Sequence, residues 1–207
     1  MPLDLTAVLD PSHTAVLMME LQRGVIGDLA MIPDLADEVR TTGILGKVRA
    51  LCDAARSNGA KVVHCTAEFR ADRAGSKANA PMLRGAKGTD LHLVVGTPSA
   101  EVVPEIGVVE SDLVVPRVFG MTPFTGTQLD QTLRNCGITT VIATGVSLNI
   151  GVIGMVVEAV GLGYTVVLAT DAVAGVPHEY AEQVIRHTLA PLTARATTAE
   201  ILAAWSA

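Results

Sequence analysis

Three features of the sequence could do chemistry, and each follows an apolar run. Glu20 follows the run 14–19, Arg117 follows the run 112–116, and a polar turn spans 144–151. A carboxylate can act as a general acid or base, and an arginine can hold a carboxylate in a bidentate way. Backbone N–H groups at the start of a helix can bind an oxyanion or a carboxylate. Together these features predict acid–base chemistry on a small, anionic molecule.

The apolar runs are continuous rather than alternating, and helical segments and glycine-marked turns separate them. This pattern is typical of a parallel sheet that is covered on both faces. Because ligands of such sheets bind beyond the carboxyl ends of the strands, we expect Glu20, Arg117 and the turn at one edge. We predict one domain over 1–207, with an irregular connection at 68–111. The predicted strands are 14–19, 61–66, 112–116, 139–144, 165–169 and 194–197, and the predicted helices are 35–57, 127–135, 149–162, 178–189 and 198–205.

The composition excludes several classes of protein. With 15 basic and 21 acidic residues the net charge is −6, which argues against a nucleic-acid binder. Hydrophobic residues at 49% and charged residues at 17% exclude intrinsic disorder. Three widely spaced cysteines, Cys52, Cys65 and Cys136, predict neither a disulfide framework nor a zinc cluster. We therefore expect a cytoplasmic protein.

The uncharged stretch 135–157 is long enough to span a bilayer. It contains many Gly, Ser, Thr and Asn residues and divides into an apolar run, a polar turn and a second apolar run. A buried strand, turn and helix therefore explain the stretch better than a membrane span. No signal peptide is expected at the N-terminus.

Four stretches, in this order, resemble the isochorismatase-like hydrolases, also called the cysteine hydrolase superfamily. They are AVLMMELQRGV at 15–25, FGMTPFTGTQLDQTLRNCGITTVIATGVSLNIGV at 119–152, GYTVVLATDAVAG at 163–175 and VIRHTLAPLTARATTAEIL at 184–202. The resemblance covers nearly the whole chain. It implies a three-layer α/β/α sandwich around a six-stranded parallel sheet of Rossmann-like topology. It also implies a cis peptide in the turn after the fourth strand, which we place at Val146–Ser147.

The resemblance further implies a site made of an acid after strand one, a lysine after strand three and, in many members, a nucleophilic cysteine after strand four. Here Glu20, Arg117 and Gly151 stand at these catalytic positions. Because glycine has no thiol, we expect hydrolysis in which Glu20 acts as acid or base on water or substrate. True isochorismatases are similar in having glycine there, and they cleave an enol ether without a covalent intermediate.

Each of these residues also has a purely structural interpretation. Glu20 can be a carboxylate that pairs with Arg117 or caps a helix, and Ser147 or Asn149 can cap the helix after strand four. Gln22 can belong to the start of a helix, and the two phenylalanines can pack in the core. The residues predicted to bind substrate are Gln22, Glu68, Phe119, Phe124, Val146, Ser147 and Ile150.

We expect no cofactor. We also expect no metal, because His64 and the distant His92 are the histidines available for a zinc site. Asp171 is expected to anchor a turn rather than to catalyse. Small residues at 154–163 predict a close helix interface, and with it a homodimer or larger homo-oligomer.

Two functional alternatives stay open: a catalytically impaired member that binds a small ligand, and an amidohydrolase that uses water in place of the thiol. A dehydrogenase is disfavoured because no Gly-x-Gly-x-x-Gly follows the first strand.

Overall fold

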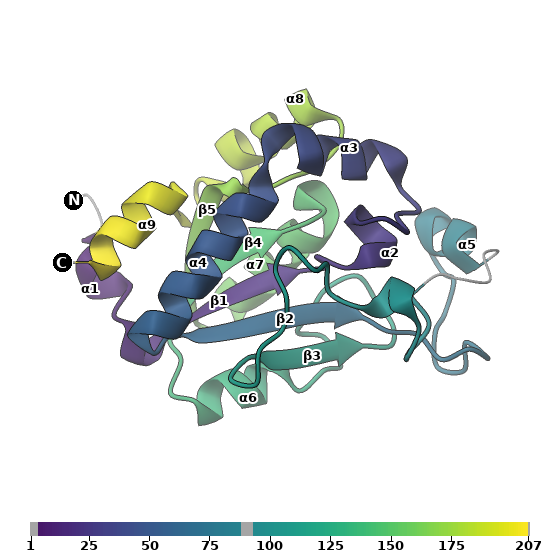
Figure 1. The fold of residues 1–207 in the computed structure, drawn as a ribbon, viewed down its shortest axis with the longest axis horizontal. Helices are drawn as coiled ribbons and strands as arrows, with labels where there is room; N and C mark the ends of the chain where they lie inside the picture. The colour runs from purple at the N-terminus through teal and green to yellow at the C-terminus, as the bar shows by residue number, and fades with distance from the viewer. Residues whose placement is uncertain (1–3, 88–92, 207) are drawn as a thin grey trace.

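The computed structural model describes residues 4–87 and 93–206. It contains a six-stranded parallel sheet in the order β3-β2-β1-β4-β5-β6 (Figure 1). The predicted fold class is therefore confirmed. The strands are β1 Thr14–Met19, β2 Lys61–Ala67, β3 Leu113–Arg117, β4 Thr140–Gly145, β5 Thr165–Val173 and β6 Ala194–Ala196.

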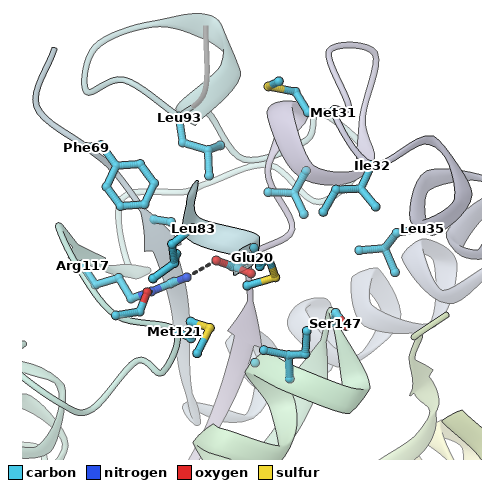
Figure 2. Close-up of a pocket in the computed structure, with 16 residues that line it drawn as sticks. Glu20, Met31, Ile32, Leu35, Phe69, Leu83, Leu93, Arg117, Met121 and Ser147 are labelled. Carbon is cyan, nitrogen blue, oxygen red and sulfur yellow. Dashed lines mark hydrogen bonds and ion pairs between the residues drawn. The ribbon is translucent and has the colours of Figure 1, made fainter. Parts of the chain in front are cut away.

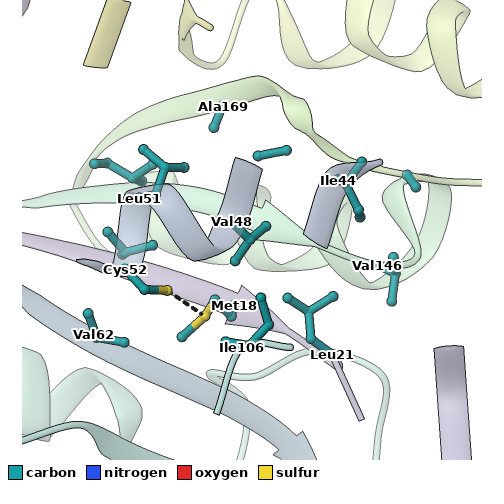
Figure 3. Close-up of a cluster of buried hydrophobic side chains, with 14 of the residues drawn as sticks. Met18, Leu21, Ile44, Val48, Leu51, Cys52, Val62, Ile106, Val146 and Ala169 are labelled. Carbon is teal, nitrogen blue, oxygen red and sulfur yellow. Dashed lines mark hydrogen bonds between the residues drawn. The ribbon is translucent and has the colours of Figure 1, made fainter. Parts of the chain in front are cut away.

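Helices cover both faces of the sheet, which explains why the strands are continuous apolar runs. One face packs against α1 Leu5–Val8, α4 Ile44–Asn58 and α9 Thr198–Trp205, and the other packs against α6 Leu129–Asn135, α7 Ile153–Gly161 and α8 His178–Gln183. Side chains of β1 alternate between the two cores: Met18 lies on the α4 side and Met19 on the α7 side. In the first core the Cys52 sulfur lies 3.3 Å from that of Met18 (Figure 3).

The strand register places the carboxyl ends of the central strands side by side at one edge of the sheet. Met19 pairs with Cys65 of β2 and with Gly145 of β4, and Ala67 of β2 pairs with Arg117 of β3. Chain connections run in opposite directions from β1 and β4, so the strand order reverses between these two strands. This reversal is where open α/β sheets bind ligands.

Several element boundaries differ from the sequence expectations. The helix predicted over 35–57 is two helices, α3 Pro33–Thr42 and α4, because Gly43 adopts a left-handed conformation with φ of 66°. The helices predicted over 149–162 and 178–189 each contain a wider π-helical turn, Leu148–Val152 and Val184–Leu189. The last helix, α9, has the predicted bounds, and Thr197 caps it.

The short helix α2 Arg23–Ile26 begins directly after Gln22, which agrees with the alternative that Gln22 belongs to the start of a helix. The short helix α5 Pro81–Lys87 and a 3₁₀ turn at Pro98–Ala100 have no apolar period, and the sequence does not predict them. The predicted connection 68–111 is therefore partly helical.

The uncharged stretch 135–157 forms the end of α6, the strand β4, a turn and the start of α7, as expected. Within the described ranges, no helix has both the length and the apolar character needed to cross a membrane.

Candidate active site

A cavity of about 320 Å³ lies beyond the carboxyl ends of the central strands. Glu20 and Arg117 are the charged members of its described lining, and Ser147, Ile150 and Gly151 line it from the turn after β4. The remaining wall is almost entirely apolar. It is formed by Val25, Met31, Ile32, Leu35, Ala67, Phe69, Met82, Leu83, Leu93, Gly120 and Met121.

Glu20 is hydrogen-bonded through its backbone to β2 at the end of β1. Its backbone has a φ of 51°, and its N–H donates to the Cys65 carbonyl at 3.0 Å. The Arg117 guanidinium donates through Nη2 to Oε1 of Glu20, as Figure 2 shows with Phe69, Leu93 and Ile32 around the pair. The side chains are 17% exposed for Glu20 and 6% exposed for Arg117. The sheet therefore places an ion pair in an apolar environment, where its electrostatic interaction is stronger than in water.

Arg117 retains hydrogen-bonding capacity beyond this pair. Its Nε donates to the Gly120 carbonyl at 3.3 Å. Its Nη1 is buried and has no hydrogen-bond partner among the residues described. A buried donor without a partner costs free energy, so a ligand oxygen that reached Nη1 would remove this cost.

The turn after β4 approaches β1 very closely. At Gly145, with φ of 98°, a Cβ atom would lie 2.3 Å from the Met19 carbonyl oxygen, so only glycine fits. The Val146 N–H donates to that same oxygen at 2.9 Å. The expected cis peptide is present between Val146 and Ser147.

Most amides of this turn already have acceptors. Leu148 donates to the Ala174 carbonyl at 2.7 Å, and Ile150 and Val152 donate to the Ser147 carbonyl. The Ser147 N–H has no acceptor in the described part of the chain, and its hydroxyl donates to Asn149 at 2.7 Å. The alternative that Ser147 or Asn149 caps this helix is not seen, because neither described helix start has a side-chain cap hydrogen bond. Ser147 therefore offers the amide that can meet an oxyanion.

Gly151 faces the cavity, and Met19 fills the space beside it. A Cβ atom at Gly151 would lie 2.8 Å from Cε and 3.1 Å from Cγ of Met19. Met19 is fully buried. A side chain at position 151 therefore requires Met19 to move.

The cysteines lie away from the described cavity wall. Cys52 on α4 and Cys65 on β2 are buried, and burial raises the pKa of each thiol to about 12. Cys136 follows α6 and packs half-buried against the second core. Buried thiols with raised pKa values are poor nucleophiles.

Of the residues predicted to bind substrate, Ser147 and Ile150 line the cavity, whereas five others are absent from its described wall. Gln22 is fully buried and bonds the backbone instead: its Nε2 donates to the carbonyls of Ala67 and Ala100, and its Oε1 accepts from the Ala67 N–H. It thereby fixes the end of β2 to the Pro98–Ala100 turn.

The other four are also held by local contacts. Glu68 accepts from the Thr66 hydroxyl at 2.9 Å, and Val146 is buried in the core. Phe124 packs on Tyr164 with ring centroids 5.9 Å apart. The Phe119 ring covers Gly126, where a Cβ atom would meet it.

Sequence reasoning missed most of the apolar wall. Met31, Ile32, Phe69 and Leu93 come from connections that have no hydrophobic period. Phe69 carried a usable signal, because it lies two residues after the end of β2.

His64 does not reach the cavity wall. It is buried and bonds Asp112 through Nε2 at 2.9 Å, and Asp112 also binds Arg56. Among the described residues no group of three His, Cys, Asp or Glu side chains is placed to hold a metal, and His92 lies outside them. Asp171 is held by structural contacts, but it anchors the start of α9 rather than a turn: it accepts from the Thr198 N–H at 2.7 Å and binds Lys47 of α4.

Comparisons with known proteins agree with this architecture. A family model described as "Isochorismatase domain" matches residues 14–201. "Uncharacterized isochorismatase family protein YecD" of Escherichia coli O157:H7 is 30% identical over 202 residues, which cover 93% of this chain and 95% of that protein. "Uncharacterized isochorismatase family protein YwoC" of Bacillus subtilis (strain 168) is 40% identical over 104 residues, so the match spans only about half of each protein, 50% of this chain and 54% of that one.

Among solved structures, a cysteine hydrolase from Pseudomonas syringae pv. phaseolicola 1448A superposes with a TM-score of 0.80. It is 23% identical and the match covers 96% of this chain and 95% of that one. At this identity the likeness concerns the fold.

Proposed function

The chain belongs to the isochorismatase family, and from that premise we propose that it is a hydrolase of a small, anionic molecule. Glu20 is the general acid and base, and no thiol attacks the substrate. The observation that carries the proposal is the Glu20–Arg117 pair in an apolar cavity whose described wall contains no cysteine.

Each group at the cavity has a role in this chemistry. Glu20 transfers a proton to the leaving oxygen of the substrate or takes one from the attacking water. Arg117 binds an anionic group of the substrate through Nη1, which has no other described partner. The Ser147 N–H stabilises negative charge that develops on the substrate. Water, rather than an enzyme side chain, forms the new bond.

Two observations support a reaction without a thiol. Gly151 stands where the family resemblance implies a cysteine, and Met19 occupies the space beside it. The raised pKa values of the buried Cys52 and Cys65 thiols disfavour their ionisation.

A ligand-binding protein without catalysis is the second candidate. It is favoured because Arg117 and Gly151 stand where the resemblance implies a lysine and a cysteine, and because the carboxylate of Glu20 is already paired. An amidohydrolase that uses water is a variant of the first candidate, with an amide in place of the enol ether.

The test is turnover of a panel that contains isochorismate, small amides and small ureides, followed by mass spectrometry. We expect cleavage of the enol ether alone, and a loss of about 10²–10⁴-fold in kcat for Glu20→Gln. Glu105→Gln, a change at an exposed glutamate outside the described cavity wall, is the matched control and should retain activity.

Full turnover by the folded Glu20→Gln enzyme would refute the assigned role. Amide cleavage instead of enol ether cleavage would favour the amidohydrolase. If a panel member raises the melting temperature but none is cleaved, the ligand-binding candidate is favoured.

A further inference from the structure

The two charges that line the cavity cancel each other. Glu20 contributes one negative charge and Arg117 one positive charge, and the remaining residues of the described wall carry none. The wall beside the pair consists of side chains such as Phe69, Leu93 and Ile32. Because uncompensated charge is costly in an apolar environment, any ligand that enters must leave the total near zero.

A carboxylate ligand would disturb this balance. Arg117 is the group that attracts it, since Nη1 is buried without a described partner while Nη2 is bound to Glu20. With the ligand in place, two carboxylates would share one guanidinium. Carboxylates that share a site hold a proton between them, because like charges at short range in a low dielectric disfavour the doubly ionised state.

Among the described residues that line the cavity, no other group can restore the balance. A further cation, Arg73, has its guanidinium 4.8 Å from the centroid of the Phe69 ring and is not itself part of the lining. Arg117 of β3 and Cys65 of β2 are the titratable residues next to Glu20. The Cys65 backbone carbonyl accepts from the Glu20 N–H, and the Cys65 thiol is the titratable group of that residue. That thiol is neutral and fully buried, and ionising it would add negative charge. The described residues of α2, α3, α5 and the turn after β4 that line the cavity carry no charged side chain.

We propose that a small, apolar carboxylate binds in this cavity together with one proton from solvent, and that Glu20 holds this proton. The ionised Glu20, the ligand anion and one proton become a neutral Glu20 carboxyl beside the ligand anion. The carbonyl oxygen of the protonated group still accepts from Nη2 of Arg117, and its O–H becomes a donor.

This inference rests on the proposed function and adds a step to it: the anionic substrate brings Glu20 into the acid form that the reaction requires. A neutral ligand leaves Glu20 ionised. The charge of the ligand therefore selects whether Glu20 begins as acid or as base.

Calorimetric titration tests the proposal without turnover. The probes are benzoate, cyclohexanecarboxylate and 3-methylbutanoate, with benzamide as the neutral analogue of benzoate. The cavity volume corresponds to about ten water-sized groups, so these molecules fit it. Titrations in two buffers with different protonation enthalpies give the number of protons that each ligand takes up.

We expect at least one carboxylate to bind with uptake of about one proton, and its Kd to rise about tenfold per pH unit over about pH 6–8. Benzamide should bind without uptake. In Glu20→Gln the amide replaces the protonated carboxyl, so that variant should bind the carboxylate with no uptake and no pH slope.

Carboxylate binding to the wild-type protein without proton uptake would overturn the proposal, as would a pH slope that persists in Glu20→Gln. Failure of all three carboxylates to bind at millimolar concentration would overturn it as well. Failure of the proposed function is read separately, from the turnover panel. If the protein takes up the proton on binding but cleaves no member of the panel, the inference on proton uptake stands and the proposed hydrolase function is refuted.

Discussion

Replacing Gly151 by alanine adds a single methyl group at the cavity wall, and the structure sets its cost. The new Cβ would lie 2.8 Å from Cε of Met19, 3.1 Å from Cγ of Met19 and 3.3 Å from the Val146 carbonyl oxygen. Carbon atoms in ordinary contact are about 3.5–4.0 Å apart. Met19 must therefore shift by several tenths of an ångström, and it is fully buried.

Overpacking of a buried site costs about 1–3 kcal/mol. Gly151 lies in a helical turn, where exchange of glycine for alanine alone gains about 0.5–1 kcal/mol. Gly46→Ala is the matched control, because Gly46 lies in α4 and a Cβ there meets nothing within 4 Å. Relative to Gly46→Ala, we expect Gly151→Ala to lower the free energy of unfolding by about 1–3 kcal/mol.

Urea unfolding at 25 °C measures both variants. In a Met19→Ala background the two crowding Met19 atoms are gone and the Val146 carbonyl contact at 3.3 Å remains, so most of the penalty of Gly151→Ala relative to Gly46→Ala should disappear. Equal effects of the two glycine variants in the wild-type background would refute the steric argument. A penalty that persists unchanged in the Met19→Ala background would also refute it.

Three further predictions concern other parts of the molecule. Burial lowers the pKa of His64 below 6.5 despite its bond to Asp112, so the unfolded chain binds the proton first. The free energy of unfolding should therefore fall as the pH drops from 6.5 to the lowered pKa. His64→Gln should flatten this part of the pH profile of urea unfolding, and identical profiles for both proteins would contradict the assignment. Gln22→Leu leaves three backbone groups at Ala67 and Ala100 without their bonds, so we expect a loss of about 3 kcal/mol in urea unfolding, and a loss below about 0.5 kcal/mol would contradict the role given to Gln22. The outer face of α7 exposes Val157, so we expect light scattering to find a dimer or larger oligomer that Val157→Lys dissociates; equal masses for both proteins would place any interface elsewhere.

The sequence predicted the sheet because each strand is a continuous apolar run with a marked end. It also predicted that Glu20, Arg117 and the turn at Ser147 would meet, because the carboxyl ends of parallel strands share one edge. The structure places all three at the cavity. The place of these residues could be predicted because it depends on the order and direction of the strands, and the apolar runs of the sequence indicate both.

The apolar wall could not be predicted in the same way. Met31, Phe69 and Leu93 come from irregular connections, where no period indicates which side chains turn inward. Gln22 looked like a site residue because it is polar and follows a strand, yet its amide satisfies buried backbone groups. The break in the predicted first helix arises from Gly43, and a single glycine in a helical pattern does not by itself indicate a break.

The central claim is hydrolysis that depends on Glu20 and on no thiol. Its most direct test is a cysteine-free variant, Cys52→Ala, Cys65→Ala and Cys136→Ala, assayed beside Glu20→Gln on a substrate that the wild-type enzyme cleaves. Melting curves establish first that both variants are folded. We predict that the cysteine-free enzyme retains kcat within about threefold, whereas Glu20→Gln loses about 10²–10⁴-fold. A folded cysteine-free enzyme that is inactive, beside an active Glu20→Gln, would contradict the account.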